Sequence, residues 1–475
     1  MAALCLLTSC AVGPNFVRPA APAVTHYSGG SDPARTVSAQ DTAQRFTAGA
    51  QIAADWWHLF SSSSLDEEIA EALVGNPGLE GAKASLRQSE DSLRSGYGIF
   101  YPQVSAGAAA TRQRYSAIKL GQNASSSLFN LFTLSASASY ALDLFGGERR
   151  ALESLGAQVD LQRATEQATY LTLVANVVNT SVAAAAYRAE IEATTGLIDL
   201  EREQLRLTEV QAQAGTVPYS TVLSIRSQLA TYEAQVPQLE QRLIQSNDLL
   251  ATLVGHVPAE WTPPVVSLSD LHLPEDLPLS LPSDLVRQRP DILAAEATAH
   301  AASASVGVAT AALLPAVTLS GGYSASGLTT GSVFAANGRE WSAGGSIVAP
   351  VFEGGTLWFK RKAAIDSYHQ AMALYRQTVL SAFAQVADSL GALQHDALVL
   401  EAQEEALQSA KEALRLVQIN YEAGLSTYIE VLVADAQLHQ ASINELQAVA
   451  TRYQDTVALY VALGGGWWST SGGIP

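Results

Sequence analysis

The longest regular pattern in the chain is a seven-residue repeat of apolar side chains near the carboxyl end. Only Gly391 places a helix-weakening residue within this repeat. Because an α-helix has about 3.6 residues per turn while the pattern repeats at about 3.5, such helices pack on neighbours as a left-handed supercoil. The pattern therefore predicts one very long helix that needs partners. Its repeated positions are Trp358, Ile365, Met372, Val379, Val386, Leu393, Leu400, Leu407, Leu414 and Tyr421.

The chain contains two copies of one arrangement. The motifs around Pro77 and Pro102 recur around Pro290 and Pro315 at a single offset. Each copy is predicted to form a helix, two strands, a very long helix, a tight turn and a returning helix. The first long helix is expected between Gly147 and Gly215, and its seven-residue register comprises Tyr170, Val177, Ala184, Ile191, Ile198 and Leu205.

The returning helices carry apolar stripes with alternating spacings of three and four residues, which predict antiparallel helical hairpins. The stripe of the second returning helix begins at Ile429 and continues to Val457. In the first one Pro237 is expected to bend the helix.

These patterns divide the chain into six segments. They are a partial signal peptide (1–9), a lipidated extended amino-terminal segment (10–64), a first repeat (65–256), a linker (257–282), a second repeat (283–466) and a carboxyl-terminal tail (467–475).

Between the helices the period of the pattern changes to two. Apolar residues alternate with small polar ones in 134–142, and the same alternation occurs in 317–323 and 341–349. Strands of about ten residues with this alternation are typical of outer-membrane barrels, and aromatic residues near the strand ends suit a membrane interface. Soluble hairpins packed on helices are the alternative. Since the smallest barrels have about eight strands, several copies of the chain would have to share one barrel.

Composition excludes several classes of protein. The 45 acidic and 27 basic residues give a net charge of −18, which argues against a nucleic-acid partner. Apolar residues make up 48% of the chain, which excludes disorder. No stretch approaches the roughly 20 apolar residues of a transmembrane helix, so a membrane crossing would be made by strands.

No pattern of catalytic or metal-binding residues is present. The eight histidines are scattered, and the sequence has no HExxH, GxSxG or phosphate-loop motif. His439 falls on an apolar stripe, where a packed histidine is expected. We therefore predict a protein that is not an enzyme and that holds no metal or cofactor.

The chain begins with a short apolar run followed by Leu7-Thr8-Ser9-Cys10, which is similar to a bacterial lipoprotein processing box. In this interpretation Cys10 is the lipidated first residue and Cys5 is removed with the signal. The run lacks a basic segment, which predicts a true translation start further upstream. The alternative is that both cysteines are buried apolar residues of a truncated start.

Several motifs, taken together and in order, resemble the TolC-like outer-membrane efflux proteins, in the lipidated branch that includes OprM and the NodT-type factors. The resemblance covers nearly all of the mature chain. The motifs are Cys10 with Val12-Gly13-Pro14-Asn15, Asp55-Trp56-Trp57, Asn76-Pro77-Gly78-Leu79, Leu142-Asp143-Leu144-Phe145-Gly146-Gly147, Arg289-Pro290-Asp291-Ile292 and Pro350-Val351-Phe352-Glu353-Gly354-Gly355.

The resemblance implies a mainly α fold with a transmembrane β portion. A homotrimer would form a twelve-stranded β-barrel in outer-membrane lipid and a twelve-helix tube in the periplasm of a Gram-negative bacterium. Drugs or other small molecules would leave passively through it, delivered by an inner-membrane RND transporter and a periplasmic adaptor. Metal-ion efflux and type I secretion are alternatives within this fold, and a structural trimeric coiled-coil surface protein is the alternative of another class.

The resemblance also implies two groups of site residues. The helical turns would contact the adaptor, although a left-handed glycine turn explains these residues equally well. The turn residues are Ala214, Gly215, Ala423 and Gly424.

The second group would close the tube around the trimer axis. Glu430 matches an acidic residue of the family, whereas Val433 replaces an acid and Asp435 lies on another face of the helix. A ring of Glu430 carboxylates would attract cations. The alternatives are a solvated surface glutamate and an apolar closure at Val433.

Overall fold

The computed structural model describes residues 11–116, 121 and 125–469. These residues belong to two compact units. The described residues within 1–19, 85–162 and 294–375 form the first unit, and those within 20–84, 163–293 and 376–475 form the second. The predicted lipidation site Cys10, all of the predicted signal peptide and the end of the predicted tail lie outside the described residues.

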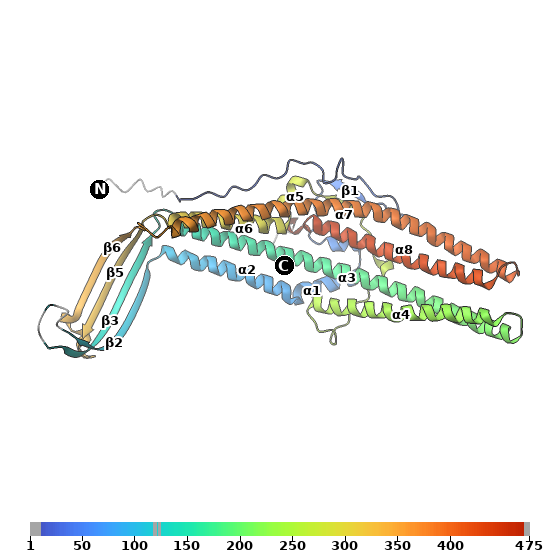
Figure 1. The fold of residues 1–475 in the computed structure, drawn as a ribbon, viewed down its shortest axis with the longest axis horizontal. Coiled ribbons are helices and arrows are strands. Elements are labelled where there is room, and N and C mark those ends of the chain that lie inside the picture. Colours follow the sequence, from blue (N-terminus) through green and yellow to red (C-terminus); the bar gives the residue numbers. More distant parts are fainter. Residues whose placement is uncertain (1–10, 117–120, 122–124, 470–475) are drawn as a thin grey trace. The chain divides into compact units, whose positions relative to one another are not determined.

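The described part of the first unit holds a four-stranded antiparallel sheet in the order β2-β3-β5-β6, as Figure 1 shows. The predicted strands are confirmed, and so is their alternation. Cross-strand partners share a face of the sheet, so the register places Ala108, Leu134 and Ala325 in one row. The strands are β2 (Gln103–Tyr115), β3 (Ser127–Leu142), β5 (Ala316–Gly327) and β6 (Arg339–Val348).

The two faces of this sheet differ in chemistry. One, the apolar face, carries alanine, leucine and aromatic residues, and the other, the serine face, carries small hydroxyl residues. The edge strands β2 and β6 are exposed along their whole length. The apolar face includes Val104, Ala106, Ala108, Leu134, Ala136, Leu319, Tyr323, Trp341 and Ile347, and the serine face includes Ser105, Ser135, Ser137, Ser320, Ser324 and Ser346.

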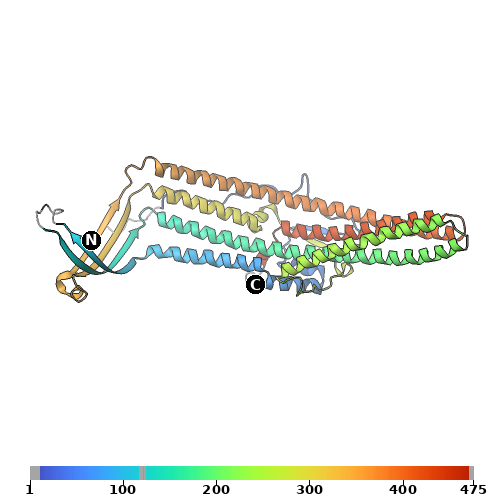
Figure 2. The same cartoon turned by 60° about the horizontal axis from the view of Figure 1, so that its bottom comes forward.

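The two predicted long helices are confirmed. Helices α3 (Gly147–Gln213) and α7 (Thr356–Glu422) each have 67 residues. Each reverses into a shorter helix, α4 (Tyr219–Val254) or α8 (Tyr428–Ala462), and Figure 2 shows that both hairpins end in tight turns at the same end of the second unit. Helix α4 continues through Pro237.

The sequence pattern predicts one helix before each pair of strands, whereas the structure has two. Helix α1 (Ser63–Gly75) ends before α2 (Pro77–Gly96), and α5 (Pro282–Gln288) ends before α6 (Pro290–Ala311). The interruptions fall at Asn76 and Arg289, whose ψ angles of 117° and 122° are extended. Both residues precede a proline, whose ring disfavours helical backbone at the residue before it.

A cluster of aromatic residues forms part of the core of the second unit. Trp56 is buried and stacks on Tyr460, with ring centroids 5.0 Å apart and an interplanar angle of 10°. Phe60 packs edge-on against Trp56. Strand β1 (Arg45–Ala48) pairs in parallel with β4 (Asp276–Leu279), so the linker contributes a strand that holds the amino-terminal segment.

Within the described residues, two helices are long and apolar enough to cross a membrane by length and composition, α3 and α6. The expectation that no stretch of the chain is long and apolar enough for a transmembrane helix is therefore wrong by length and composition. Most of the apolar window in α3 is buried in the fold, which is what the core helix of a helical protein shows.

Candidate functional site

The two hairpin turns have the same backbone structure. Gly215 and Gly424 have φ angles of +76° and +73°, and both turns are exposed, including Ala214 and Ala423. The crossed hydrogen bonds are those of a Schellman motif, in which a left-handed glycine ends the helix. They run from Thr216 N to Gln211 O (3.0 Å) and Gly215 N to Ala212 O (3.0 Å), and from Leu425 N to Asn420 O (2.8 Å) and Gly424 N to Tyr421 O (2.9 Å).

Replacing Gly424 by alanine is expected to destabilise the second turn by about 1 kcal/mol, because an L-residue is strained at this φ. A Cβ at Gly424 would meet no atom within 4 Å, so strain is the only cost. Gly391→Ala is the matched control, since Gly391 lies inside α7 with similar space and alanine should stabilise the helix. Hydrogen exchange of the amides around each substituted residue measures the two effects. Equal effects at the two positions would contradict the prediction.

The structure separates the predicted gate residues. Glu430 is exposed, and its Oε1 accepts a hydrogen bond of 3.2 Å from the hydroxyl of Thr427, the N-cap residue of α8. Its carboxylate therefore stabilises the positive end of the helix dipole. Val433 is 52% exposed, and Ile429, one turn earlier, is 60% exposed. The prediction that Ile429 belongs to the packed stripe is wrong, because Tyr428 and Val431 are the residues buried there.

Asp435 lies away from both of these residues and forms a hydrogen-bonded carboxyl pair with Glu201 of α3. Glu201 is only 5% exposed. Within the described residues, no other hydrogen-bond donor reaches Glu201 Oε2 or Asp435 Oδ2. Burial, followed by the neighbouring Asp435 carboxylate, raises the pKa of Glu201 to about 7, and burial raises the pKa of Asp435. The pair therefore shares one proton, because two adjacent buried carboxylates cannot both ionise.

Two tyrosines face this pair, Tyr232 from α4 and Tyr428 from α8. His439 packs edge-on against Tyr232, with ring centroids 4.9 Å apart, and its Nε2 lies 3.2 Å from Gln235 Oε1. Burial lowers the pKa of His439, so it is a neutral packed histidine, as predicted. The pair thus joins the two hairpins in a weakly polar environment.

Glu201 could be recognised in the sequence. It lies three residues after Ile198 and four before Leu205, so it falls on the apolar stripe of the first long helix. A carboxyl group at such a position must be buried with a partner. The partner itself lies on a helix of the other repeat, and no local pattern identifies it.

The contact between Glu201 and Asp435 is expected to weaken as pH rises. The pKa of Glu201 is raised from 4.5 to about 7, so the protonated pair contributes its full stability below about pH 4.5 and loses it as pH rises through about 7. Glu201→Gln donates at every pH and should remove this dependence. We expect local opening of α8 to increase between pH 5 and 8 about tenfold more in the wild type than in the variant, after correction for intrinsic exchange.

Hydrogen exchange resolved to α8 measures this change. Glu203→Gln is the matched control, because Glu203 is exposed on the same helix and pairs with Arg206. A local readout is needed because burial also raises the pKa of Glu68 and Asp396 to about 7. The same pH dependence in wild type and Glu201→Gln would contradict the shared proton.

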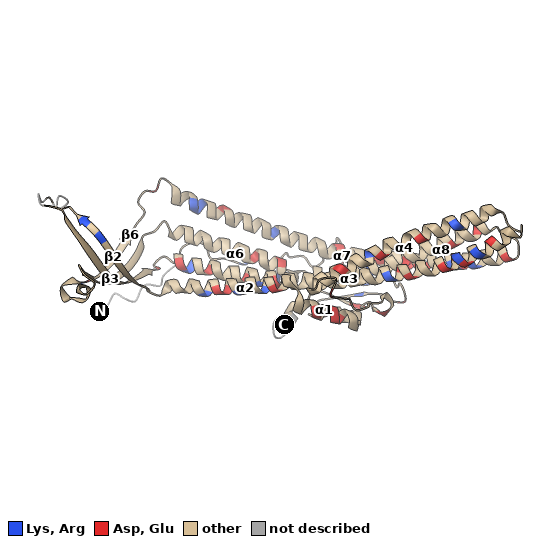
Figure 3. Cartoon of the chain, turned by 90° about the horizontal axis from the view of Figure 1, so that it is seen from below, with Lys and Arg blue, Asp and Glu red and all other residues tan. Residues whose placement is uncertain are grey.

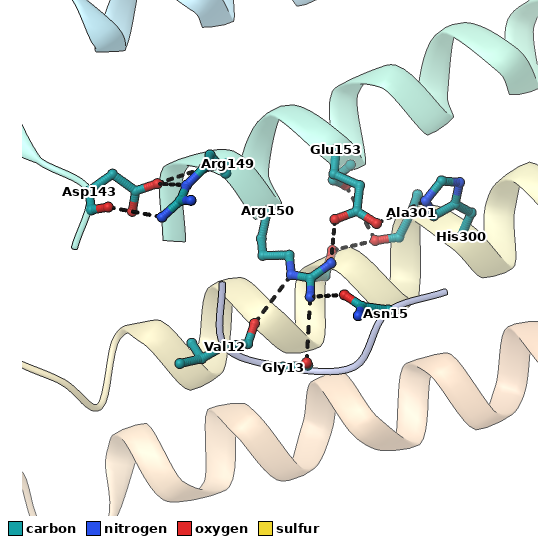
Figure 4. A network of polar contacts seen from close by, with 11 residues as sticks. Val12, Gly13, Asn15, Asp143, Arg149, Arg150, Glu153, His300 and Ala301 are labelled. Carbon is teal, nitrogen blue, oxygen red and sulfur yellow. Dashed lines mark hydrogen bonds and ion pairs between the residues drawn. The ribbon is translucent and has the colours of Figure 1, made fainter. Parts of the chain in front are cut away.

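In the first unit, the segment that follows Cys10 is held by Arg150, which is buried at the start of α3 (Figure 4). The guanidinium donates to Val12 O (3.2 Å), to Asn15 Oδ1 (2.6 Å) and to Glu153 Oε2 (2.6 Å). Val12 N donates to Phe145 O at 3.0 Å. These contacts fix the first described residues beside the end of β3.

The same network extends to α6. Glu153 Oε1 lies 3.0 Å from His300 Nε2, and the ring of Phe16 stacks on His300 with centroids 4.6 Å apart. Burial acts to raise the pKa of Glu153, but the hydrogen bonds from Arg150 and His300 lower it by a larger amount. The pKa is therefore below its usual value, and the carboxylate is ionised. Gly13 passes so close to Gly307 that a Cβ on Gly13 would lie 2.4 Å from Gly307 Cα. The glycine in the motif Val12-Gly13-Pro14-Asn15 is therefore required by this close approach.

An open cavity of about 680 Å³ adjoins the carboxyl pair in the second unit. Its lining includes Glu201, Asp435, Leu414 and Tyr421. Among the described residues, no three histidine, cysteine, aspartate or glutamate side chains gather in a way that could hold a metal ion.

Comparison with known proteins agrees with this architecture. The signature of the family described as outer membrane efflux protein matches residues 69–256 and 281–465, so it is present twice. The chain is 32% identical to the pyoverdine export outer membrane protein OpmQ of Pseudomonas putida over 88% of this chain and 89% of that one. It is 27% identical to the cation efflux system protein CusC of Escherichia coli, over 97% of this chain and 96% of that one.

A solved structure is also similar. The outer-membrane channel OprN superposes with a TM-score of 0.87 at 27% identity, covering 96% of this chain and all of that chain. The tandem repeat, the sheet between the helices and the long helical hairpins are the features shared with such channels. The chain therefore belongs to the outer membrane efflux protein family, and it is an exit duct of an efflux system in the outer membrane, not an enzyme.

Proposed function

We propose that the duct is a homotrimer in which three four-stranded sheets close one twelve-stranded barrel and six helical hairpins form one tube. The observation that carries this proposal is the open sheet of the described structure, whose edge strands β2 and β6 are exposed along their whole length. An uncovered edge in lipid would leave backbone groups without partners, which costs several kcal/mol each. Helix α7 also exposes apolar residues outside the seven-residue repeat, including Leu374, Leu380, Leu398, Val399, Leu416 and Ile419.

The mass of the full chain in detergent and its conductance in planar bilayers test this proposal. A trimer that conducts ions supports it. A folded monomer, or a trimer that never conducts, would overturn it, and the second result would favour the structural coiled-coil alternative.

We propose that Cys10 carries a covalent lipid. The support is the position of the adjoining residues, since Ala11 lies against Gly146 and Val12 is bonded to Phe145 at the sheet end of α3. An anchor there would enter the membrane beside the barrel. Mass spectrometry of the mature amino terminus from the membrane fraction tests this, and an unmodified Cys10 or retained residues 1–9 would contradict it.

We propose that the exposed turns at Gly215 and Gly424 bind a periplasmic adaptor that connects the duct to an inner-membrane RND transporter. Their identical geometry would present a repeated surface to the hairpins of the adaptor. Leu425 and Tyr219 beside these turns are exposed, which provides apolar contact area. Crosslinking from cysteines introduced at Ala214 and Ala423 should capture the adaptor, whereas a cysteine at Ser269 should not.

We propose that Ile429 and Val433 form an apolar constriction at the end of the tube, with Glu430 beside it. Their exposure in the described protomer supports this. Val433→Asp should hydrate the constriction and raise the conductance about threefold or more. Gln437→Asp, one turn along the exposed face, is the control. If both variants conduct alike, the constriction lies elsewhere, with Glu430 as the remaining candidate.

The cargo is proposed to be drugs or other small molecules. OpmQ and CusC are named for pyoverdine and cation export, so channels of one fold serve chemically different cargo. We infer that the pump selects the cargo. Deleting the gene and measuring drug, metal and protein export in parallel separates the proposed role from metal-ion efflux and type I secretion.

A further inference from the structure

The apolar face of the sheet changes its chemistry towards the end away from the helices. On β2 the residues of this face are Val104, Ala106, Ala108 and Ala110, followed by Arg112 and Arg114. They share a face because side chains in a strand alternate with a period of two. Figure 3 shows these basic positions on β2 at the end away from the helices.

A third arginine lies on the same face. Arg339 is the partner of Ala325, which belongs to the row of Ala108 and Leu134. Glu340, the only acidic residue in the four strands, pairs with Ser324 on the serine face. The apolar face of the four strands therefore carries three arginines and no carboxylate, in a chain whose net charge is −18. Arg112 and Arg114 lie at its outer end, and Arg339 lies nearer the helices, in the row of Ala108.

The positions of Arg112 and Arg114 match the edge of a bilayer. Arg112 and Arg114 lie about 26 and 33 Å along β2 from Val104, at about 3.3 Å per residue. With a strand tilt of about 40°, these values correspond to about 20 and 25 Å across the membrane, close to the height of the apolar band of a barrel. Arginine costs little at this depth, because its guanidinium reaches the interface.

Hydrogen bonds orient two of the guanidinium groups. Arg114 Nε donates to Ser126 Oγ at 2.7 Å, and an Arg339 guanidinium nitrogen donates to Phe334 O at 3.1 Å. Each guanidinium has five N–H donors, so several remain for an anion. A planar fork of donors fits phosphate oxygens in pairs, which a single ammonium cannot do.

A groove of about 670 Å³ lies beside Arg339. Its lining includes small side chains, Ala106, Ala108 and Ala325, and larger ones, Leu134, Tyr323 and Phe334. Phe334 is 70% exposed, which is costly in water but not in lipid. Because the rows of Ala106 and Ala108 lie nearer the helices than Arg112 and Arg114, the groove lies deeper in the apolar interior of a bilayer than these two arginines.

We propose that this face binds a phosphorylated lipid of the outer leaflet, with its phosphate at Arg112 and Arg114 and an acyl chain that reaches into the groove. The inference rests on the position of the chain in the outer membrane and adds a specific lipid site to it. It does not depend on the number of protomers, because all the residues come from one chain.

The test is binding of lipid A with two phosphates to the purified full chain in detergent, followed by native mass spectrometry. The double variant Arg112→Gln, Arg114→Gln should bind about tenfold or more weakly, since charge-assisted contacts to phosphate are lost. Arg415→Gln is the control, because Arg415 is an exposed arginine of α7 paired with Glu412. Equal affinity of the double variant and the wild type would overturn the proposal.

Further binding experiments distinguish a lipid phosphate from free phosphate, and those on the wild-type protein do not depend on the folding of a variant. Wild-type protein should bind lipid A without phosphates about tenfold more weakly, and inorganic phosphate at about 10 mM should compete only weakly because it cannot fill the groove. Ala108→Phe should reduce lipid binding by filling the groove. If dephosphorylated lipid bound as well as lipid A, phosphate recognition would be excluded without any variant. The mass of the same sample reports the oligomer separately, so a failure of the trimer proposal would be distinguishable.

Discussion

Arg289→Leu is expected to destabilise the second unit by about 3 to 5 kcal/mol, because a buried, fully bonded guanidinium is replaced by a group without donors. The side chain donates to both carboxylate oxygens of Asp291, at 2.9 and 2.7 Å. It also donates to Gln385 Oε1 at 2.6 Å and to Ala462 O at 2.8 Å. It thus connects the start of α6 with α7 and with the last residue of α8.

The loss should be largest at the end of α8. Ala462 O is one of the carbonyl groups that a helix leaves without an internal partner, and a cation near this end also interacts favourably with the helix dipole. Hydrogen exchange of residues 456–466 in the full chain measures the local opening. Arg287→Leu is the matched control, because Arg287 is exposed two residues earlier in α5. Comparable exchange in the two variants would contradict the assigned role.

Arg150→Leu is expected to release the amino-terminal segment, with a local cost of about 3 kcal/mol. The bonds from Arg150 to Val12 O, Asn15 Oδ1 and Glu153 would be lost together, and the Glu153 carboxylate would keep only His300 (Figure 4). Exchange of the amides in 11–19 should accelerate by about 100-fold, since about 1.4 kcal/mol corresponds to a factor of ten. Arg150→Lys should accelerate it less, because it keeps the charge.

Arg94→Leu serves as the control for this experiment. Arg94 lies on α2 in the same unit, and its side chain is 73% exposed beside Asp91 and Glu90, so its ion pairs should contribute less than about 1 kcal/mol. Unchanged exchange of 11–19 in Arg150→Leu would show that Gly13 and the backbone bond to Phe145 hold the segment without the guanidinium.

Local patterns predicted most of the elements. The seven-residue repeat predicted α7 because side chains about 3.6 residues apart lie on the same face of a helix. The alternation predicted the strands because every second side chain of a strand lies on the same face. The glycines at 215 and 424 predicted the turns, since glycine is the residue that adopts a left-handed backbone without steric strain. The interruptions before Pro77 and Pro290 were also predictable from the restriction on the preceding residue, although the repeat pattern alone suggested single helices.

Other properties needed the packed structure. The stripe of α8 suggested that Ile429 is buried, but the neighbouring hairpin covers Tyr428 and Val431 instead. The partner of Glu201 is Asp435, on a helix of the other repeat. The common face of Arg112 and Arg339 depends on the registers of three strand pairs.

By itself the sequence determined the duplicated order of helices and strands, the alternating faces of the sheet and the membership of an efflux family, because these properties depend on residues within a few positions of one another. Only the tertiary structure decided which carboxyl groups share a proton, how Arg150 and Arg289 are bonded and which face gathers the arginines. Burial and pairing depend on which surfaces meet, and surfaces from distant parts of the chain meet only when the fold forms.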